Sequence, residues 1–194
     1  MKSINSIFKK ICVLTIAASM AGCDMLDTKP YDFVAPETFY KNETDCNMAL
    51  AGIYWTMAAE HVYGNRYSCM LSNVDDLSYY YRQNQTGAVF ANAHNTGNTD
   101  LWYTWTSLYS GINNANVLLD HIDNADISDG KTKQRIKGEA KFLRAYYHFL
   151  LVQGWYEVPI RKTTVTDIAT SSLEATPHAE ALDWIIQEME ECID

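Results

Sequence analysis

The chain has 194 residues, which is enough for one domain with a sizeable hydrophobic core. Its hydrophobic content of 47% and charged content of 20% are typical of a globular protein and argue against disorder. The formal net charge of -9 argues against nucleic acid as a partner, because binding to a phosphate backbone needs a basic surface.

The N-terminus has the features of a bacterial lipoprotein leader. Three lysines precede an apolar run over residues 11–20, which is too short to span a bilayer as a stable helix. The run is followed by Ala-Gly and then Cys23, which resembles a lipobox. We therefore expect a signal peptide over residues 1–22, and a lipidated Cys23 with its tether over residues 23–43. An ordinary secretory peptide with an incidental cysteine is the alternative.

Three cysteines remain once the leader and the lipidated residue are set aside: Cys46, Cys69 and Cys192. Their number is odd and their spacing is not that of a metal site, so no metal centre is predicted. Cys46 and Cys192 lie on apolar faces of predicted helices, where cysteine packs as a small core residue. A disulfide remains open as an alternative in an oxidising compartment.

Apolar residues at steps of three and four predict two helices in the first part of the chain. The first runs from about Thr44, as its N-cap, to Glu60. Gly52 lies inside this helix, where we expect it to permit close approach of a neighbouring helix. The second helix runs over about 99–123, with apolar and aromatic residues along its inner face.

The central helix, predicted over about 131–153, has two apolar rows. One row consists of Ile136, Ala140, Leu143, Tyr147 and Leu150, and the other of Phe142, Ala145, Tyr146 and Phe149. Two rows predict neighbours on both sides, as in stacked helical hairpins. Gly154 is predicted to end the helix. Glu139 and Arg144 lie between the rows, so each charge must be paired or exposed.

An irregular link over 155–172 precedes the last helix, which is predicted to begin with Thr176 as N-cap and Pro177 at the first position. Its apolar face consists of Leu182, Ile185, Ile186, Met189 and Ile193. We expect the glutamates of 188–191 to be solvated. The whole pattern predicts an all-α domain over residues 44–194.

In residues 64–98 the apolar residues show no regular spacing, and glycine and asparagine are frequent, which predicts a long loop. Loops of this length inside a compact domain are usually functional. The loop contains three consecutive tyrosines over 79–81, followed by Arg-Gln-Asn84. Aromatic rings beside amides suit the C–H faces and hydroxyls of a sugar. Packing of the tyrosines onto the helices is an equally good explanation.

Four further residues are weaker candidates for the same kind of site: His94, Asn95, Trp102 and Trp155. Trp102, together with Trp105, fits better in the hydrophobic core.

The sequence contains no recognisable catalytic constellation. Its five histidines are scattered, and neither a Gly-x-Ser-x-Gly elbow nor a phosphate-binding loop occurs. Glu139 and His148 could form an acid–base pair, but nine residues place them about two and a half turns apart on one helix. We expect Glu139 to pair with a basic neighbour and His148 to be partly exposed. Neither an enzyme nor a cofactor is predicted.

The central segment resembles the signature of the SusD/RagB family. The resemblance rests on Gly138-Glu139-Ala140-Lys141-Phe142-Leu143-Arg144-Ala145-Tyr146, on Gly154, and on Val158-Pro159-Ile160. Leu26-Asp27 and Pro30, shortly after Cys23, are similar to the start of these proteins. The family consists of outer-membrane nutrient-binding lipoproteins of Bacteroidetes. The resemblance implies tetratricopeptide-like stacked helical hairpins on a lipid anchor at the outer membrane. It also implies that the protein is exposed at the cell surface, where it captures its ligand.

The resemblance also implies a site and a partner. In glycan-binding members an aromatic pair is followed by an asparagine, and Tyr79-x-Tyr81-x-x-Asn84 matches that spacing. We therefore expect Tyr79, Tyr81 and Asn84 to bind an oligosaccharide, which is handed to a SusC-like TonB-dependent transporter without bond chemistry. A peptide ligand and a helical scaffold that contacts the transporter are the alternatives. The resemblance covers nearly all of this chain but only the N-terminal part of the family's length.

Overall fold

The computed structural model describes residues 39–68, 77, 94–165, 167 and 171–192. Its helices are α2 (Glu43–Ala58), α4 (Thr99–His121), α5 (Gly130–Trp155) and α6 (His178–Glu190), with the π-helical turn η2 (Glu60–Gly64) and the 3-10 turn η4 (Ile122–Asn124). β-Pairing in this part of the chain is limited to two isolated bridges, Asn42 with Asp126 and Val158 with Thr176. The all-α prediction is confirmed.

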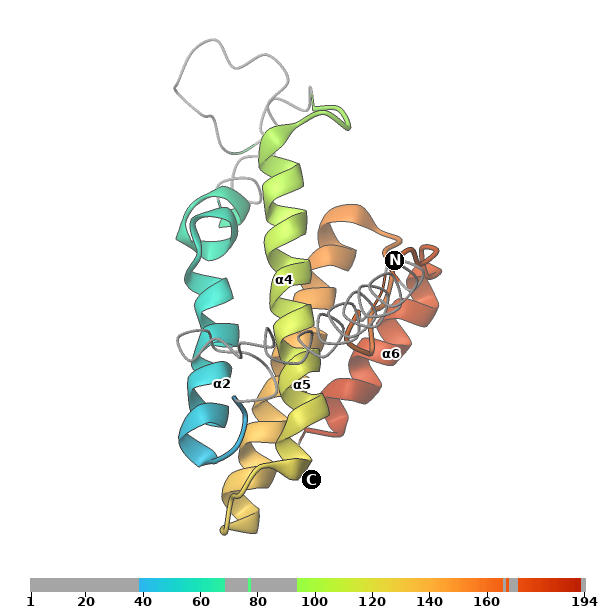
Figure 1. The fold of residues 1–194 in the computed structure, drawn as a ribbon. Helices are drawn as coiled ribbons and strands as arrows, with labels where there is room; N and C mark the ends of the chain where they lie inside the picture. Colours follow the sequence, from blue (N-terminus) through green and yellow to red (C-terminus); the bar gives the residue numbers. More distant parts are fainter. Residues whose placement is uncertain (1–38, 69–76, 78–93, 166, 168–170, 193–194) are drawn as a thin grey trace, which may run out of the picture. The chain divides into compact units, whose positions relative to one another are not determined.

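Helices α4 and α5 form an antiparallel hairpin at the centre of the described domain (Figure 1). Helix α2 packs against both of them, and α6 packs against α5. Asp129 begins α5 as its N-cap, because its carboxylate accepts hydrogen bonds from the backbone N–H groups of Lys131 and Thr132 at 3.1 and 3.2 Å. The arrangement is the stacked helical hairpin that the sequence predicts.

The first apolar row of α5 forms the centre of the core. Its five members are at most 2% exposed. They pack with buried residues of the neighbouring helices: Cys46, Leu50 and Ile53 of α2 and Leu108, Ile112 and Ala115 of α4. The second row is covered unevenly, since Ala145 is buried but Phe142 is 44% exposed. Within the described residues, the prediction of a neighbour over the whole second row is therefore wrong at Phe142.

The glycine that allows close helix packing is Gly111 of α4, not Gly52 of α2. A Cβ on Gly111 would lie 2.7 Å from Cε2 of Tyr147 and 2.8 Å from Cγ2 of Thr56. A Cβ on Gly52 would meet no atom within 4 Å. The prediction for Gly52 is wrong because this residue lies on the exposed face of its helix.

The start of α2 also differs from the prediction. The cap is Asn42, whose side-chain oxygen accepts a hydrogen bond from the backbone N–H of Asp45 at 3.0 Å. Asn42 also pairs with Asp126, so a contact distant in sequence fixes the residue that caps the helix. Thr44 falls inside α2 instead of capping it.

The ends of α5 and α6 are set by the link between them. Helix α5 continues through Gly154 and ends at Trp155; its C-cap Tyr156 has a φ of 68°, which turns the chain away from the helix. Thr176 does not cap α6; its backbone N–H donates to the carbonyl oxygen of Val158 at 3.0 Å. On α6, Ala181 and Ile185 face the core, whereas Ile186 is 54% exposed and does not belong to the buried face.

Candidate functional site

Arg144 lies in a buried polar cluster between α4, α5 and α6. Its Nε donates to Oε1 of Glu188 at 3.0 Å, and its Nη1 donates to Oδ1 of Asn116 at 2.7 Å and to the carbonyl oxygen of Lys162 at 2.9 Å. The side chains of Arg144 and Glu188 are only 10% and 8% exposed. The sequence predicts that the charge of Arg144 is either paired or exposed, and the structure shows that it is paired. The prediction that Glu188 is solvated is wrong, because Glu188 lies on the face of α6 that meets Arg144.

His148 is fully buried one turn after Arg144. One ring nitrogen, Nδ1, donates to the carbonyl oxygen of Arg144 at 2.9 Å, and Nε2 accepts from the backbone N–H of Arg161 at 3.0 Å. The ring is therefore neutral, and burial lowers the pKa of His148 to about 3. The expected partial exposure of His148 is wrong. Glu139 pairs with Arg135 at 2.6 Å, as predicted.

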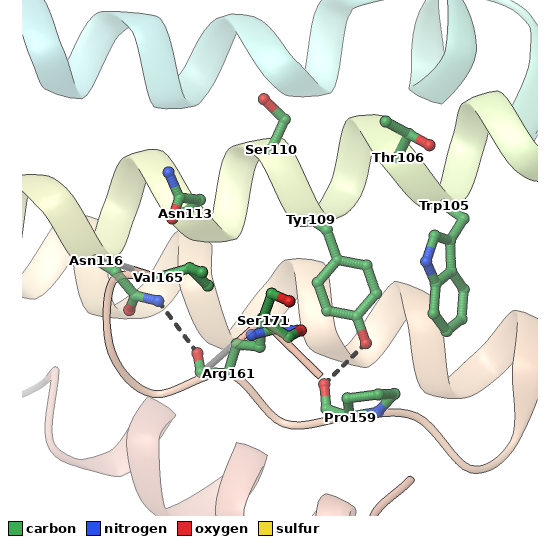
Figure 2. A pocket seen from close by; sticks show the side chains of 10 residues that line it. All are labelled: Trp105, Thr106, Tyr109, Ser110, Asn113, Asn116, Pro159, Arg161, Val165 and Ser171. Carbon is green, nitrogen blue, oxygen red and sulfur yellow. Dashed lines mark hydrogen bonds between the residues drawn. The ribbon is translucent and has the colours of Figure 1, made fainter. Parts of the chain in front are cut away.

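Two side chains of α4 bind the link that follows α5 (Figure 2). The hydroxyl of Tyr109 donates to the carbonyl oxygen of Pro159 at 2.8 Å. Nδ2 of Asn116 donates to the carbonyl oxygens of Thr163 at 3.0 Å and Arg161 at 3.3 Å. The side chain of Asn116 therefore bridges α4 to the backbone of the link. We call the four side chains that hold the link, Tyr109, Asn116, Arg144 and His148, the buried clamp.

A hollow of about 470 Å³ lies between α4 and the clamped link (Figure 2). We call it the Tyr109 hollow. Its walls combine aromatic rings with hydroxyl and amide groups, including Trp105, Tyr109, Thr106, Ser110, Asn113 and Arg161. The guanidinium of Arg161 donates to the carbonyl oxygen of Ser171. The sequence pattern alone gave no sign of this hollow, because the wall opposite α4 comes from an irregular segment.

A second hollow, of about 570 Å³, lies where α4 begins and α5 ends. We call it the tryptophan hollow, and its lining includes His94, Asn95, Asn98, Trp102, Trp105 and Trp155. The four weaker sequence candidates therefore come together in one place. Trp102 is 59% exposed, so the prediction that it belongs to the core is wrong. Trp105 is partly buried and packs against the core, as predicted.

Trp105 connects the two hollows because it lines both. Its ring lies 5.4 Å from that of Trp155 and 4.8 Å from that of Tyr109, measured between centroids. We call the two hollows together the α4 groove. Each volume falls in the range of small-molecule sites, which are mainly apolar with a few polar groups that fix orientation. The aromatic walls can pack on the C–H faces of a sugar while hydroxyls and amides bind its hydroxyls.

Several predicted residues lie outside the described part of the chain: Tyr79, Tyr81, Asn84, Cys23 and Cys69. Their roles stay predictions. Cys46 is buried and Cys192 partly buried, and both are free thiols. Across residues 39–68, 77, 94–165, 167 and 171–192, no group of His, Cys, Asp or Glu is arranged to hold a metal ion. None of the helices in these ranges is both long and apolar enough to cross a membrane.

Sequence comparison matches this chain to one family and to full-length relatives. The profile of the SusD-like family described as "Starch-binding associating with outer membrane" matches residues 24–194. SusD-like protein P25 of Formosa agariphila is 29% identical over 158 residues, which cover 77% of this chain and 30% of that protein. SusD-like protein P2 of the same organism is 26% identical over 93% of this chain and 36% of its own length. The chain thus spans about a third of the length of these relatives.

Solved structures agree with this assignment. A SusD homolog from Bacteroides thetaiotaomicron superposes with a TM-score of 0.70 at 20% identity, over 81% of this chain and 31% of its own, which shows the shared fold. A laminarin-binding SusD-like protein superposes with a TM-score of 0.67 at 25% identity, over 79% of this chain and 34% of its own. The profile match covers most of the chain, and the helical hairpins agree with it, so this chain belongs to the SusD-like family of outer-membrane-associated binding proteins.

Proposed function

We propose that this protein captures an oligosaccharide at the outer membrane and delivers it to a SusC-like TonB-dependent transporter. The observation that carries the proposal is the convergence of Trp102, Trp105 and Trp155 with Asn95 in the tryptophan hollow. Indole rings offer flat apolar surfaces, and the amide offers both a donor and an acceptor for sugar hydroxyls. The family description and the laminarin-binding relative support a glycan as the ligand.

The aromatic segment predicted to bind sugar fits the same proposal. His94, which lines the tryptophan hollow, follows Asn84 by ten positions in the sequence. A chain of that length spans at most roughly 36 Å when fully extended. The aromatic segment is thus joined to the hollow by a short stretch of chain, and we propose that Tyr79, Tyr81 and Asn84 contact the same ligand.

The anchor and the partner complete the proposal. A lipid on Cys23 would hold the protein at the outer membrane through the tether of residues 23–43. Capture needs no bond chemistry, because the ligand only has to be bound and released to the transporter. No cofactor enters this mechanism.

The test is thermal unfolding of the whole chain in detergent, with and without malto-oligosaccharides and laminari-oligosaccharides. A ligand that binds only the folded state raises the melting temperature. We expect Trp102→Ala to abolish the rise. The control is Trp55→Ala, since Trp55 is 70% exposed on α2 and does not line the groove; this variant should keep the rise.

Other outcomes of this experiment would redirect the proposal. Loss of the rise in Tyr81→Ala but not in Trp102→Ala would place the site in the aromatic segment instead of the α4 groove. A rise with peptides but with neither glycan would favour a peptide ligand. A melting temperature that no ligand changes would favour the alternative that the protein is a helical scaffold that contacts the transporter.

A further inference from the structure

We propose that the Tyr109 hollow is a second sugar subsite, so that the α4 groove binds a neutral oligosaccharide along the helix and not one sugar at its end. This inference rests on the proposed function. It adds to the proposed function a subsite on the side of Trp105 that faces away from Trp102. It also specifies that the ligand is several sugars long and carries no charge.

The two hollows follow one face of α4. Trp102, Trp105, Tyr109 and Asn113 recur at steps of three and four, so they lie in one row along the helix. Eleven residues from Trp102 to Asn113 correspond to roughly 16 Å of helix. That distance exceeds the width of one pyranose ring severalfold. A ligand that packs on Trp105 in the tryptophan hollow can therefore continue past it into the Tyr109 hollow.

The lining of the groove fits a ligand without charge. Among its described residues there is no Asp, Glu or Lys, although the chain as a whole has 24 acidic residues. Arg161 is the one Arg in this lining, and its Nη2 already donates a hydrogen bond to the carbonyl oxygen of Ser171. The hydroxyl of Thr106 donates to the carbonyl oxygen of Trp102 and keeps its lone pairs for a donor. Hydroxyls and amides with aromatic walls match a neutral, hydroxyl-rich chain.

Ser110 and Asn113 are the polar groups on which the subsite depends. Both line the Tyr109 hollow, and neither side chain forms a hydrogen bond to any residue that the structure describes. Figure 2 shows both side chains on α4, with Ser110 pointing away from the hydrogen bonds of Tyr109 and Asn116. Their donors and acceptors are available to a ligand without any rearrangement of the core.

The opposite wall of the hollow is preformed. The buried clamp fixes the backbone from Pro159 to Thr163 through hydrogen bonds to Pro159, Arg161, Lys162 and Thr163. Figure 2 shows two of them, from Tyr109 to Pro159 and from Asn116 to Arg161. A wall that is ordered on folding costs no further ordering entropy when a ligand binds. The clamp therefore positions Pro159 and Arg161 before the oligosaccharide arrives.

The experiment is isothermal titration of the whole chain with malto- and laminari-oligosaccharides, from disaccharide to heptasaccharide. We expect affinity to rise with length until both hollows are filled. Asn113→Ala should lower the affinity for long oligosaccharides by roughly three- to tenfold, which corresponds to the loss of one hydrogen bond. The affinity for the shortest oligosaccharide that binds should not change. Asn114→Ala is the matched control, because Asn114 is the next residue of α4, is exposed and does not line the hollow.

A second variant, Ser110→Trp, fills the hollow from an exposed position and should reduce the affinity of long oligosaccharides to that of short ones. Circular dichroism verifies that each variant keeps its helices. An affinity that is independent of length, with Asn113→Ala equal to Asn114→Ala, would overturn the second subsite and leave glycan capture intact. No binding of either series at any length would overturn both.

Discussion

Arg144 of α5 and Glu188 of α6 form a buried ion pair, with Nε of the arginine 3.0 Å from Oε1 of the glutamate. Glu188→Ala would leave the guanidinium buried without its charge partner. We expect this change to lower the free energy of unfolding by about 3–5 kcal/mol. Urea unfolding followed by circular dichroism measures the loss.

A neighbouring ion pair provides the control for burial. Nζ of Lys141 lies 3.0 Å from Oε2 of Glu191, also between α5 and α6, but this pair is exposed to solvent. Glu191→Ala should change the unfolding midpoint little, because exposed pairs are screened by water. Equal losses in Glu188→Ala and Glu191→Ala would contradict the role given to burial.

His148 should make the fold sensitive to acid. Above its ordinary pKa of 6.5 the ring is neutral in both the folded and unfolded states. As the pH falls from 6.5 toward 3, the unfolded state gains a proton that the folded state does not, because burial and then the charges of Arg144 and Lys162 lower the pKa of the folded ring. The free energy of unfolding should fall by up to about 1.4 kcal/mol per pH unit in this window.

The variant His148→Gln isolates that contribution. The amide can donate to the carbonyl of Arg144 and accept from the N–H of Arg161, but it takes up no proton in this range. We expect the stability difference between the unmodified chain and the variant to shrink as the pH falls from 6.5 toward 3. Unfolding curves that stay parallel across this window would show that His148 is not the titrating group.

Substitution by alanine should lower the free energy of unfolding at Gly111 and raise it at Gly52. At Gly111 the added methyl group would press on Tyr147, whose hydroxyl is held by the carbonyl of Ile53 at 2.5 Å, so the ring cannot move away. We expect Gly111→Ala to destabilise by about 1–3 kcal/mol. At Gly52 the methyl group meets open space, so Gly52→Ala should stabilise by about 0.5–1 kcal/mol. Thermal and urea unfolding of both variants test the contrast.

The proposed lipid anchor is tested at Cys23. In a bacterial host, the unmodified protein should incorporate labelled palmitate and sediment with membranes. Cys23→Ala should lose the label, because the proposal places the acyl group on this thiol. Cys12→Ala is the control, since Cys12 lies within the segment expected to be removed, and this variant should still be labelled. Equal labelling of the Cys23 variant would exclude this cysteine as the anchor.

The positions of the helices follow from the sequence, because their apolar residues repeat at steps that are local to each helix. The row Ile136, Ala140, Leu143, Tyr147 and Leu150 predicts both α5 and its buried face. The family signature was equally readable, since it consists of contiguous residues. The place of Arg144 between two apolar rows predicted that its charge is either paired or exposed, but not which of the two.

Only the tertiary structure decided which polar residues are buried and where the helices end. Whether Glu188 is solvated depends on Arg144, 44 residues earlier, and whether His148 is exposed depends on the backbone of Arg161. The cap of α2 and the end of α5 likewise depend on segments that periodicity cannot describe. The α4 groove could not be predicted either, because its walls are distant along the sequence. Packing of α4 against α5 brings together Trp102, Trp155 and the link at Arg161.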